Sequence, residues 1–218
     1  MAVTVSKAQI WQLDNKLYDS NLEENSELKN HPYLNESGKA AVDNYMYDTK
    51  KQQDVSSVKL GYMSDEFISI GNISLREGSM PQEDDEAAIE WDTLIKLNQG
   101  TTIGQDIVIN IRKSNSPYSD VIEKTYKLTG ILNNYTNVWT GGNNVPGIIL
   151  KEDEADSINR IGKATYIYLS NNYIDKNYTG IYEGLKKRTK KSLIYNSSGM
   201  IMSHGAVDIY TIICISYL

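Results

Sequence analysis

The stretch Asp106-Ile107-Val108-Ile109-Asn110-Ile111-Arg112 decides the fold class, because it is the clearest β-strand in the sequence. Its three isoleucines stand at every second position, so they share one face of a strand and are expected to be buried. Residues 126–132 predict a second strand, which ends at the turn-forming pair Asn133-Asn134. The middle of the chain therefore contributes strands to a sheet.

Outward from this centre, alternating or short apolar runs predict further strands at residues 58–62, 87–90, 147–150 and 163–170. Apolar residues at helical spacing predict helices over residues 7–22, from Ser37 through Met46, and over 179–192. Residues 91–97 predict one or two helical turns that end before Gly100, and residues 152–160 predict a helix with carboxylates in its first turn, where the helix dipole favours them. Such a mixed order of helices and strands predicts an α+β fold with a mixed β-sheet and packed helices. The residues expected in the core are Ile68, Ile89, Leu94, Ile107, Ile109, Ile111, Leu128, Ile131, Ile149, Ile167 and Leu169.

Composition excludes several functional classes. The 218 residues include 22 Lys and Arg against 28 Asp and Glu, which gives a net charge of −6 and argues against a nucleic-acid partner. The single cysteine, Cys214, cannot form an internal disulfide or a multi-cysteine zinc site. No secretory signal is readable at the start, and no run of about 18 apolar residues is present. Residues 205–218 (GAVDIYTIICISYL) fit either a buried last strand or the start of a membrane helix.

The motifs that carry chemistry are weak. His31 and His204 are the only histidines, and neither lies beside a recognisable nucleophile. The acidic run at residues 83–86 is contiguous, whereas paired catalytic carboxylates come from separate elements, so a solvated turn is expected there. Gly38-Lys39 and Gly162-Lys163 lack the rest of a phosphate-binding loop. We therefore predict no catalytic residue, no cofactor and no metal.

Four segments together form a recognisable pattern. They are residues 67–81 (FISIGNISLREGSMP), 86–90 (EAAIE), 102–109 (TIGQDIVI) and 126–135 (YKLTGILNNY). The pattern resembles the large extracytoplasmic domain of FtsX-like, MacB-type ABC transporter permeases. Gly78 with Pro81 would form a reversal between strands, and Gly130 would allow close backbone approach. Ser79 and Gln105 depart from the family pattern.

The resemblance implies a fold like the MacB periplasmic core, with two lobes in a single extracellular domain over residues 1–204. Residues 1–62 plus 126–204 would form one lobe, and residues 63–125 an inserted β-rich lobe. Residues 205–218 would begin a following transmembrane helix, which places the domain outside the cytoplasm on a cell membrane. The implied partners are the membrane, a separate cytoplasmic ATPase subunit that hydrolyses ATP, and a peptide, lipoprotein or drug cargo. The implied role is non-catalytic: export, mechanotransmission or the sensing of antimicrobial peptides.

A second hypothesis is a secreted or surface module that binds glycans or peptides. Trp139, in the Gly- and Asn-rich segment 139–146 (WTGGNNVP), is the candidate ligand-contact residue for this role. A tryptophan that fills a small core under the loop is the alternative for the same position. A signal sequence before the gene segment would favour the secreted module, and an apolar span directly after it would favour the permease.

Overall fold

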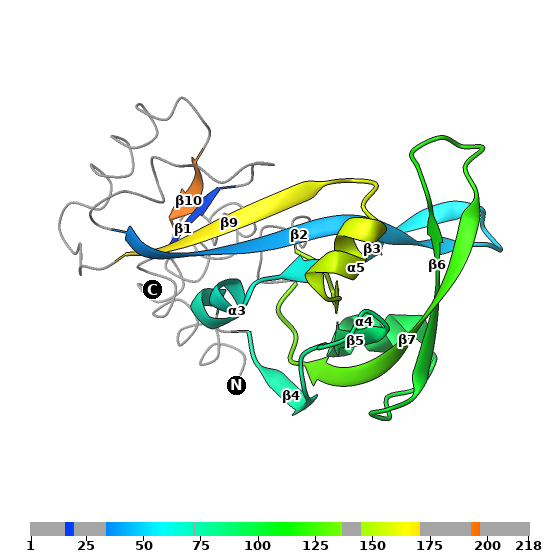
Figure 1. The fold of residues 1–218 in the computed structure, drawn as a ribbon, viewed down its shortest axis with the longest axis horizontal. Helices are drawn as coiled ribbons and strands as arrows, with labels where there is room; N and C mark the ends of the chain where they lie inside the picture. Colours follow the sequence, from blue (N-terminus) through cyan, green and yellow to red (C-terminus); the bar gives the residue numbers. More distant parts are fainter. Residues whose placement is uncertain (1–15, 20–33, 72, 137–144, 171–192, 197–218) are drawn as a thin grey trace, which may run out of the picture.

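The computed structural model describes residues 16–19, 34–71, 73–136, 145–170 and 193–196 (Figure 1). The strands are β1 Lys16–Asp19, β2 Leu34–Asp48, β3 Gln53–Met63, β4 Leu75–Gly78, β5 Glu86–Glu90, β6 Asp106–Arg112, β7 Val121–Leu132, β8 Ile148–Ile149, β9 Lys163–Ser170 and β10 Leu193–Asn196. The helices are α3 Asp65–Gly71, α4 Trp91–Leu97 and α5 Glu152–Ser157.

These strands form one mixed sheet in the order β10-β1-β9-β2-β3-β8-β5-β7-β4, and β6 pairs with β7 and, at one position, with β2. The pairs β3–β8 and β5–β7 are parallel, whereas the other described pairs are antiparallel. In Figure 1, β9, β2 and β3 run along the long axis, while β6 and β7 cross one end. The predicted α+β class with a mixed sheet is confirmed.

Two buried clusters form the core. The larger one draws on β3, β5, β6, β7, β8, α4 and α5, and the smaller one surrounds Phe67 of α3. The predicted core is confirmed at Ile89, Leu94, Ile107, Ile109, Ile111, Leu128, Ile131 and Ile149, all of which are buried. Ile68 is partly buried against the smaller cluster. The side chains of Ile167 and Leu169 lie outside the described part of the molecule.

Two helix predictions were wrong. The segment from Ser37 to Met46 belongs to strand β2. In the segment 7–22, residues 16–19 form strand β1, and the other residues of the segment lie outside the described part of the chain. β2 lies in the middle of the sheet between β9 and β3, so residues on both of its faces are buried. Register shifts after Val42 and after Tyr45 break the period of two. The resulting apolar spacing imitates one face of a helix.

Several other elements agree more closely with the sequence, whereas α3, β4 and β10 were not predicted. Strands were predicted correctly at 58–62, 87–90 and 163–170, the strand predicted at 147–150 is limited to Ile148–Ile149, and α4 was predicted with its bounds. β7 begins five residues earlier than predicted, and α5 ends at Ser157 instead of at residue 160. The predicted helix over 179–192 and the predicted membrane segment 205–218 lie outside the described residues. The division into two lobes stays a prediction.

The resemblance pattern marks positions where backbones meet closely. Gly78 has φ +80°, and a Cβ there would collide with the carbonyl oxygen of Thr129. A Cβ on Gly130 would collide with the carbonyl oxygen of Ser79. These two glycines let β4 and the loop after it lie directly against β7. The architectural role expected for Gly78 and Gly130 is thus confirmed.

Candidate functional site

The first and last described strands lie side by side. β1 pairs with β10 in antiparallel fashion, with Leu17 opposite Asn196 and Tyr18 opposite Tyr195. The chain therefore enters the described sheet at residue 16 and leaves it at residue 196 on the same side. Both strands lie at one end of the sheet, and the loop between β6 and β7 lies at the other (Figure 1).

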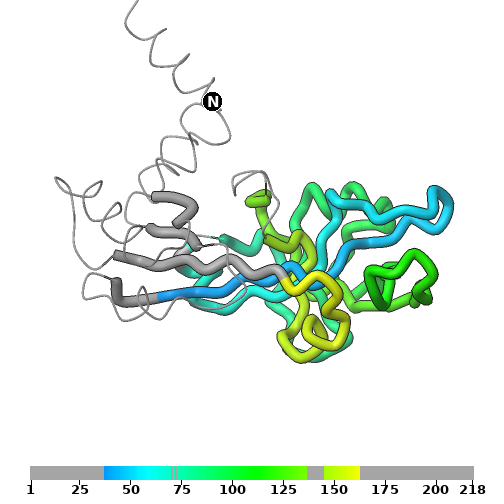
Figure 2. Tube along the Cα trace, turned by 90° about the horizontal axis from the view of Figure 1, so that it is seen from above, coloured from blue at the N-terminus to red at the C-terminus, as the bar shows by residue number. Residues whose placement is uncertain are grey.

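Strand β2 connects these two ends. It pairs with β9 from Leu34 to Val42 and with β3 from Ala40 to Asp48. A strand of 15 residues is about 50 Å long, since each residue adds about 3.3 Å. The β2–β3 and β6–β7 hairpins both lie at one end of the molecule (Figure 2), and β1 and β10 lie toward the other end (Figure 1). β2 thus forms a continuous backbone path from the paired ends to the distal hairpins.

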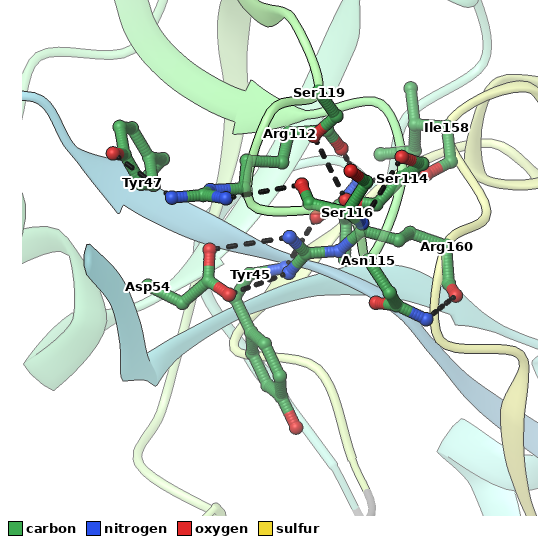
Figure 3. A network of polar contacts seen from close by, with 11 residues as sticks. Tyr45, Tyr47, Asp54, Arg112, Ser114, Asn115, Ser116, Ser119, Ile158 and Arg160 are labelled. Atoms are coloured by element: carbon green, nitrogen blue, oxygen red, sulfur yellow. Dashed lines mark hydrogen bonds and ion pairs between the residues drawn. The ribbon is translucent and has the colours of Figure 1, made fainter. Parts of the chain in front are cut away.

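A polar network joins the distal hairpins to the α5–β9 loop (Figure 3). Arg160, whose side chain is 3% exposed, binds Asp54 of β3 through both carboxylate oxygens, at 3.3 and 3.2 Å. Arg112 of β6 donates to the Tyr47 hydroxyl of β2 at 3.1 Å and to the Ser116 carbonyl oxygen at 3.3 Å. A planar guanidinium suits such contacts because its donors form a rigid fork. We call these residues the distal arginine network.

The amide of Asn44 strengthens the same junction from inside the sheet. Its Nδ2 donates to the carbonyl oxygens of Arg112 at 3.0 Å and of Ile158 at 2.8 Å. Asn115 in the β6–β7 loop donates to the carbonyl oxygen of Arg160 at 3.4 Å. Three segments distant in sequence are therefore tied together by side chain to backbone hydrogen bonds. This arrangement stiffens the distal end of the sheet.

Asp43, the residue before Asn44, is a buried carboxylate that is 1% exposed. Its Oδ1 accepts a hydrogen bond from Asn159 Nδ2 at 2.8 Å, whereas its Oδ2 has no hydrogen-bond partner among the described residues. Burial, followed by the charge of Asp156, raises the pKa of Asp43 to about 6. Among the described groups with a clearly shifted pKa, Asp43 has the value closest to neutral pH.

Glu90 is a buried carboxylate with a structural role. It accepts hydrogen bonds from the backbone amides of Tyr135 and Thr136 at 2.7 Å and from the hydroxyls of Thr136 and Thr93. The Tyr135 hydroxyl in turn donates to the carbonyl oxygen of Pro146. Since Glu90 is fully satisfied, it fixes the corner after β7 and is no candidate for acid–base chemistry.

A groove of about 290 Å³ lies between β3, the β4–β5 loop and the start of α5. Its apolar lining residues are Met63, Met80, Pro81, Ile149 and Leu150, and its charged ones are Asp65, Lys151 and Glu152. The groove therefore combines apolar contacts with charged groups of both signs.

The residues singled out from sequence divide into two groups. Trp139, His31 and His204 lie outside the described residues. Residues 83–85 of the acidic run form an exposed turn, as expected, and Glu86 begins β5. Glu86 accepts hydrogen bonds from the amides of Gln82 and Glu83, and Asp84 pairs with Lys151 at 3.2 Å. In the described part of the chain, no three His, Cys, Asp or Glu side chains are placed to hold a metal ion.

Sequence reasoning missed Arg112, Arg160 and Asp43. The available signal was the pair Asp43-Asn44, which interrupts an apolar run in mid-segment, because buried polar residues need specific partners. The partners themselves come from segments about 70 to 115 residues away, beyond the reach of any local pattern.

Comparisons with known proteins were made on sequence and on structure. No protein-family model and no curated protein matches the chain. Among solved structures, the chain is similar to the periplasmic region of MacB from Actinobacillus actinomycetemcomitans. The TM-score is 0.50 and the identity 12%, over 89% of this chain and 94% of that one. A domain from Porphyromonas gingivalis that is assigned to a permease protein aligns with a TM-score of 0.42 and 12% identity, over 82% of this chain and 85% of that one.

This chain has the fold of the MacB periplasmic region. The alignment covers 94% of that region, so the similarity extends over the whole domain and not over one motif. The MacB-like fold expected from the four sequence segments is confirmed. Within the described residues, no helix combines the length and the apolar character that crossing a bilayer requires.

Proposed function

We propose that this chain is the extracytoplasmic domain of an ABC transporter permease and that it transmits movement from the membrane to its distal hairpins. The pairing of β1 with β10 carries the proposal. A domain inserted between two membrane helices must receive and return the chain at neighbouring points, and this pairing meets that requirement. The role requires no bond-making chemistry, and a separate cytoplasmic ATPase would supply the energy.

The interior of the domain supports a rigid body that moves as a unit. β2 extends over about 50 Å and is held on both sides by β9 and β3, so displacement at one end is carried to the other. The distal arginine network joins the hairpins through charge-assisted contacts that are partly exposed, with Arg112 bound to Tyr47 of β2 and Arg160 bound to Asp54 of β3. Rigid-body rotation of such a domain is a common way to convert a small displacement into a larger one. In this proposal the distal end of the domain contacts the cargo, which is a peptide, a lipoprotein or a drug.

The location is tested by cysteine labelling of the full-length protein in spheroplasts, with Cys214 replaced by Ser. Tyr118 is 95% exposed in the β6–β7 loop, so Tyr118→Cys should react with a membrane-impermeant maleimide without lysis. Ala155→Cys is the matched control, because Ala155 is fully buried and should react only after denaturation. Labelling of Tyr118→Cys only after lysis would place the domain inside the cytoplasm and refute the proposal.

The mechanical role is tested in the complete transporter with its ATPase. Asp54→Asn removes the counter-charge of buried Arg160 and should lower ATP-dependent transport while the ATPase still co-purifies. Lys51→Gln is the control, because Lys51 is 71% exposed in its pair with Asp48 and such a pair contributes little. Equal transport by the two variants would show that the distal network plays no part in coupling.

A further inference from the structure

The groove between β3, the β4–β5 loop and α5 is not needed for a mechanical role. Its volume of about 290 Å³ lies just below the range of about 300–1,000 Å³ that is usual for small-ligand sites, so any ligand would be small. Met63 and Met80, whose flexible side chains adapt to different apolar shapes, contribute to its lining together with Pro81 and Ile149. The groove therefore offers apolar contact to a small molecule.

The charges around the groove are mainly negative. Asp65 and Glu152 line it, and Glu66 follows Asp65 in the first turn of α3. Burial and then the charges of Glu152, Asp65 and Glu66 raise the pKa of Tyr62 to about 12, so the three carboxylates act on the same ring. Within the described residues, no cation forms an ion pair with Asp65 or Glu66. An anionic ligand would be repelled here, and a cationic ligand would be attracted.

Lys39 already occupies a cation position at this groove. Its Nζ lies 3.3 Å from Glu152 Oε1 and 5.9 Å from the centroid of the Tyr62 ring. Carboxylate and aromatic ring together are a recurring environment for an ammonium group. The side chain of Lys39 is 36% exposed and that of Glu152 is 48% exposed, so their ion pair contributes little to stability and a ligand can compete with it. Lys151, the lysine that lines the groove, is paired with Asp84.

We propose that this groove binds a small organic cation, whose apolar body contacts Met63, Met80 and Pro81 and whose charged group lies against Asp65 and Glu152. The chemical class is an ammonium, amidinium or guanidinium group on an apolar or aromatic body. Lys39 competes with the ligand for Glu152 and Tyr62. This inference goes beyond the proposed function, because it concerns the isolated domain and requires neither a membrane nor an ATPase.

Benzamidine is a suitable probe, since it carries one amidinium on an aromatic ring. The chain is labelled with ¹³C at its methionine methyl groups and titrated by NMR. The signals of Met63 and Met80 should shift, with a Kd of about 1 mM or below, while Met46, which packs in the larger core cluster, should not. Benzoate, which has the same ring and the opposite charge, should leave all three signals unchanged.

Three variants test the assignment of residues. Asp65→Asn should weaken benzamidine binding about two- to fivefold, and Lys39→Gln should tighten it by a similar factor. Glu123→Gln, which removes an exposed carboxylate of β7 that does not line the groove, should leave the affinity unchanged.

Absence of benzamidine binding, equal shifts with benzoate, or an unchanged affinity in both Asp65→Asn and Lys39→Gln would overturn the proposal. Binding of a short arginine-containing peptide without binding of benzamidine would also overturn it, because the site would then recognise a polypeptide. None of these results bears on membrane placement, so failure here is distinguishable from failure of the proposed function.

Discussion

Asp43→Asn should remove a pH dependence of stability that is opposite in sign to that of ordinary carboxylates. The pKa of Asp43 is about 6 in the folded protein against 3.8 for an unperturbed side chain. This difference of about 2 units corresponds to about 3 kcal/mol. Because the folded state binds the proton more tightly, the contribution of Asp43 is most favourable below pH 3.8 and is lost as the pH rises through 6.

The free energy of unfolding is measured by urea titration at about pH 4.5 and about pH 7.5 for the full 218-residue chain. Other carboxylates contribute to both proteins, so the difference between wild type and Asp43→Asn isolates the buried group. That difference should change by about 2 kcal/mol between the two pH values, with the wild type relatively more stable at the lower pH. Asp106→Asn alters an exposed carboxylate of β6 and is the control. The difference in the free energy of unfolding between wild type and Asp106→Asn should be nearly the same at the two pH values.

Parallel stability profiles for wild type and Asp43→Asn would refute the reasoning. They would mean that Asp43 Oδ2 has a partner or solvent access that the structure does not give it. Asp156→Asn provides an independent check, because Asp156 is the second-largest cause that raises the pKa of Asp43. Removing that charge should lower the pKa of Asp43, so the contribution of Asp43 to the free energy of unfolding should change less between the two pH values.

Ile109→Ala should cost about 2–5 kcal/mol, because Ile109 is fully buried on β6, whereas Val108→Ala on the exposed face should change stability by about 0.5 kcal/mol or less. In a thermal melt this difference is about 5–20 °C in Tm, and equal melting temperatures would show that the two faces of β6 are assigned wrongly. Glu90→Gln should lower the free energy of unfolding by about 1–3 kcal/mol, because both carboxylate oxygens accept hydrogen bonds at the corner after β7 and an amide has only one such oxygen. A chemical denaturation curve that superimposes on that of wild type would contradict this role. The double variant Tyr18→Cys/Tyr195→Cys, made without the native cysteine, should form a disulfide on mild oxidation. Tyr18 and Tyr195 are opposite residues of an antiparallel pair, whose Cα atoms lie about 4.5–5.5 Å apart. A chain that stays reduced would argue against the β1–β10 pairing.

Local patterns were sufficient where one face of an element is buried and the other is exposed. In β6 the buried and exposed residues alternate, and the sequence shows the same period of two at Ile107, Ile109 and Ile111. α4 covers the residues that were predicted to be helical, and it ends at a left-handed C-cap at Asn98. The four segments that resemble MacB-type permeases lie in this part of the chain.

Local patterns failed where tertiary contacts override them. In β2, burial on both faces and two register shifts remove the alternation that identifies a strand. The groove was also invisible in the sequence, since its lining comes from β3, the β4–β5 loop and the start of α5. Neither the position of Lys39 over Tyr62 nor the ion pair of Arg160 with Asp54 has a sequence signature.

The sequence by itself determined the α+β class, the strands at the centre of the chain and the likeness to MacB-type permeases, because alternation and turn glycines are local properties. The tertiary structure alone decided that residue 16 and residue 196 lie together, that Asp43 is buried, and that the carboxylates of α3 and α5 meet at one groove. The physical reason is that these features depend on strand pairing between residues more than 80 positions apart, and the free energy of such pairing comes from burial across the whole sheet.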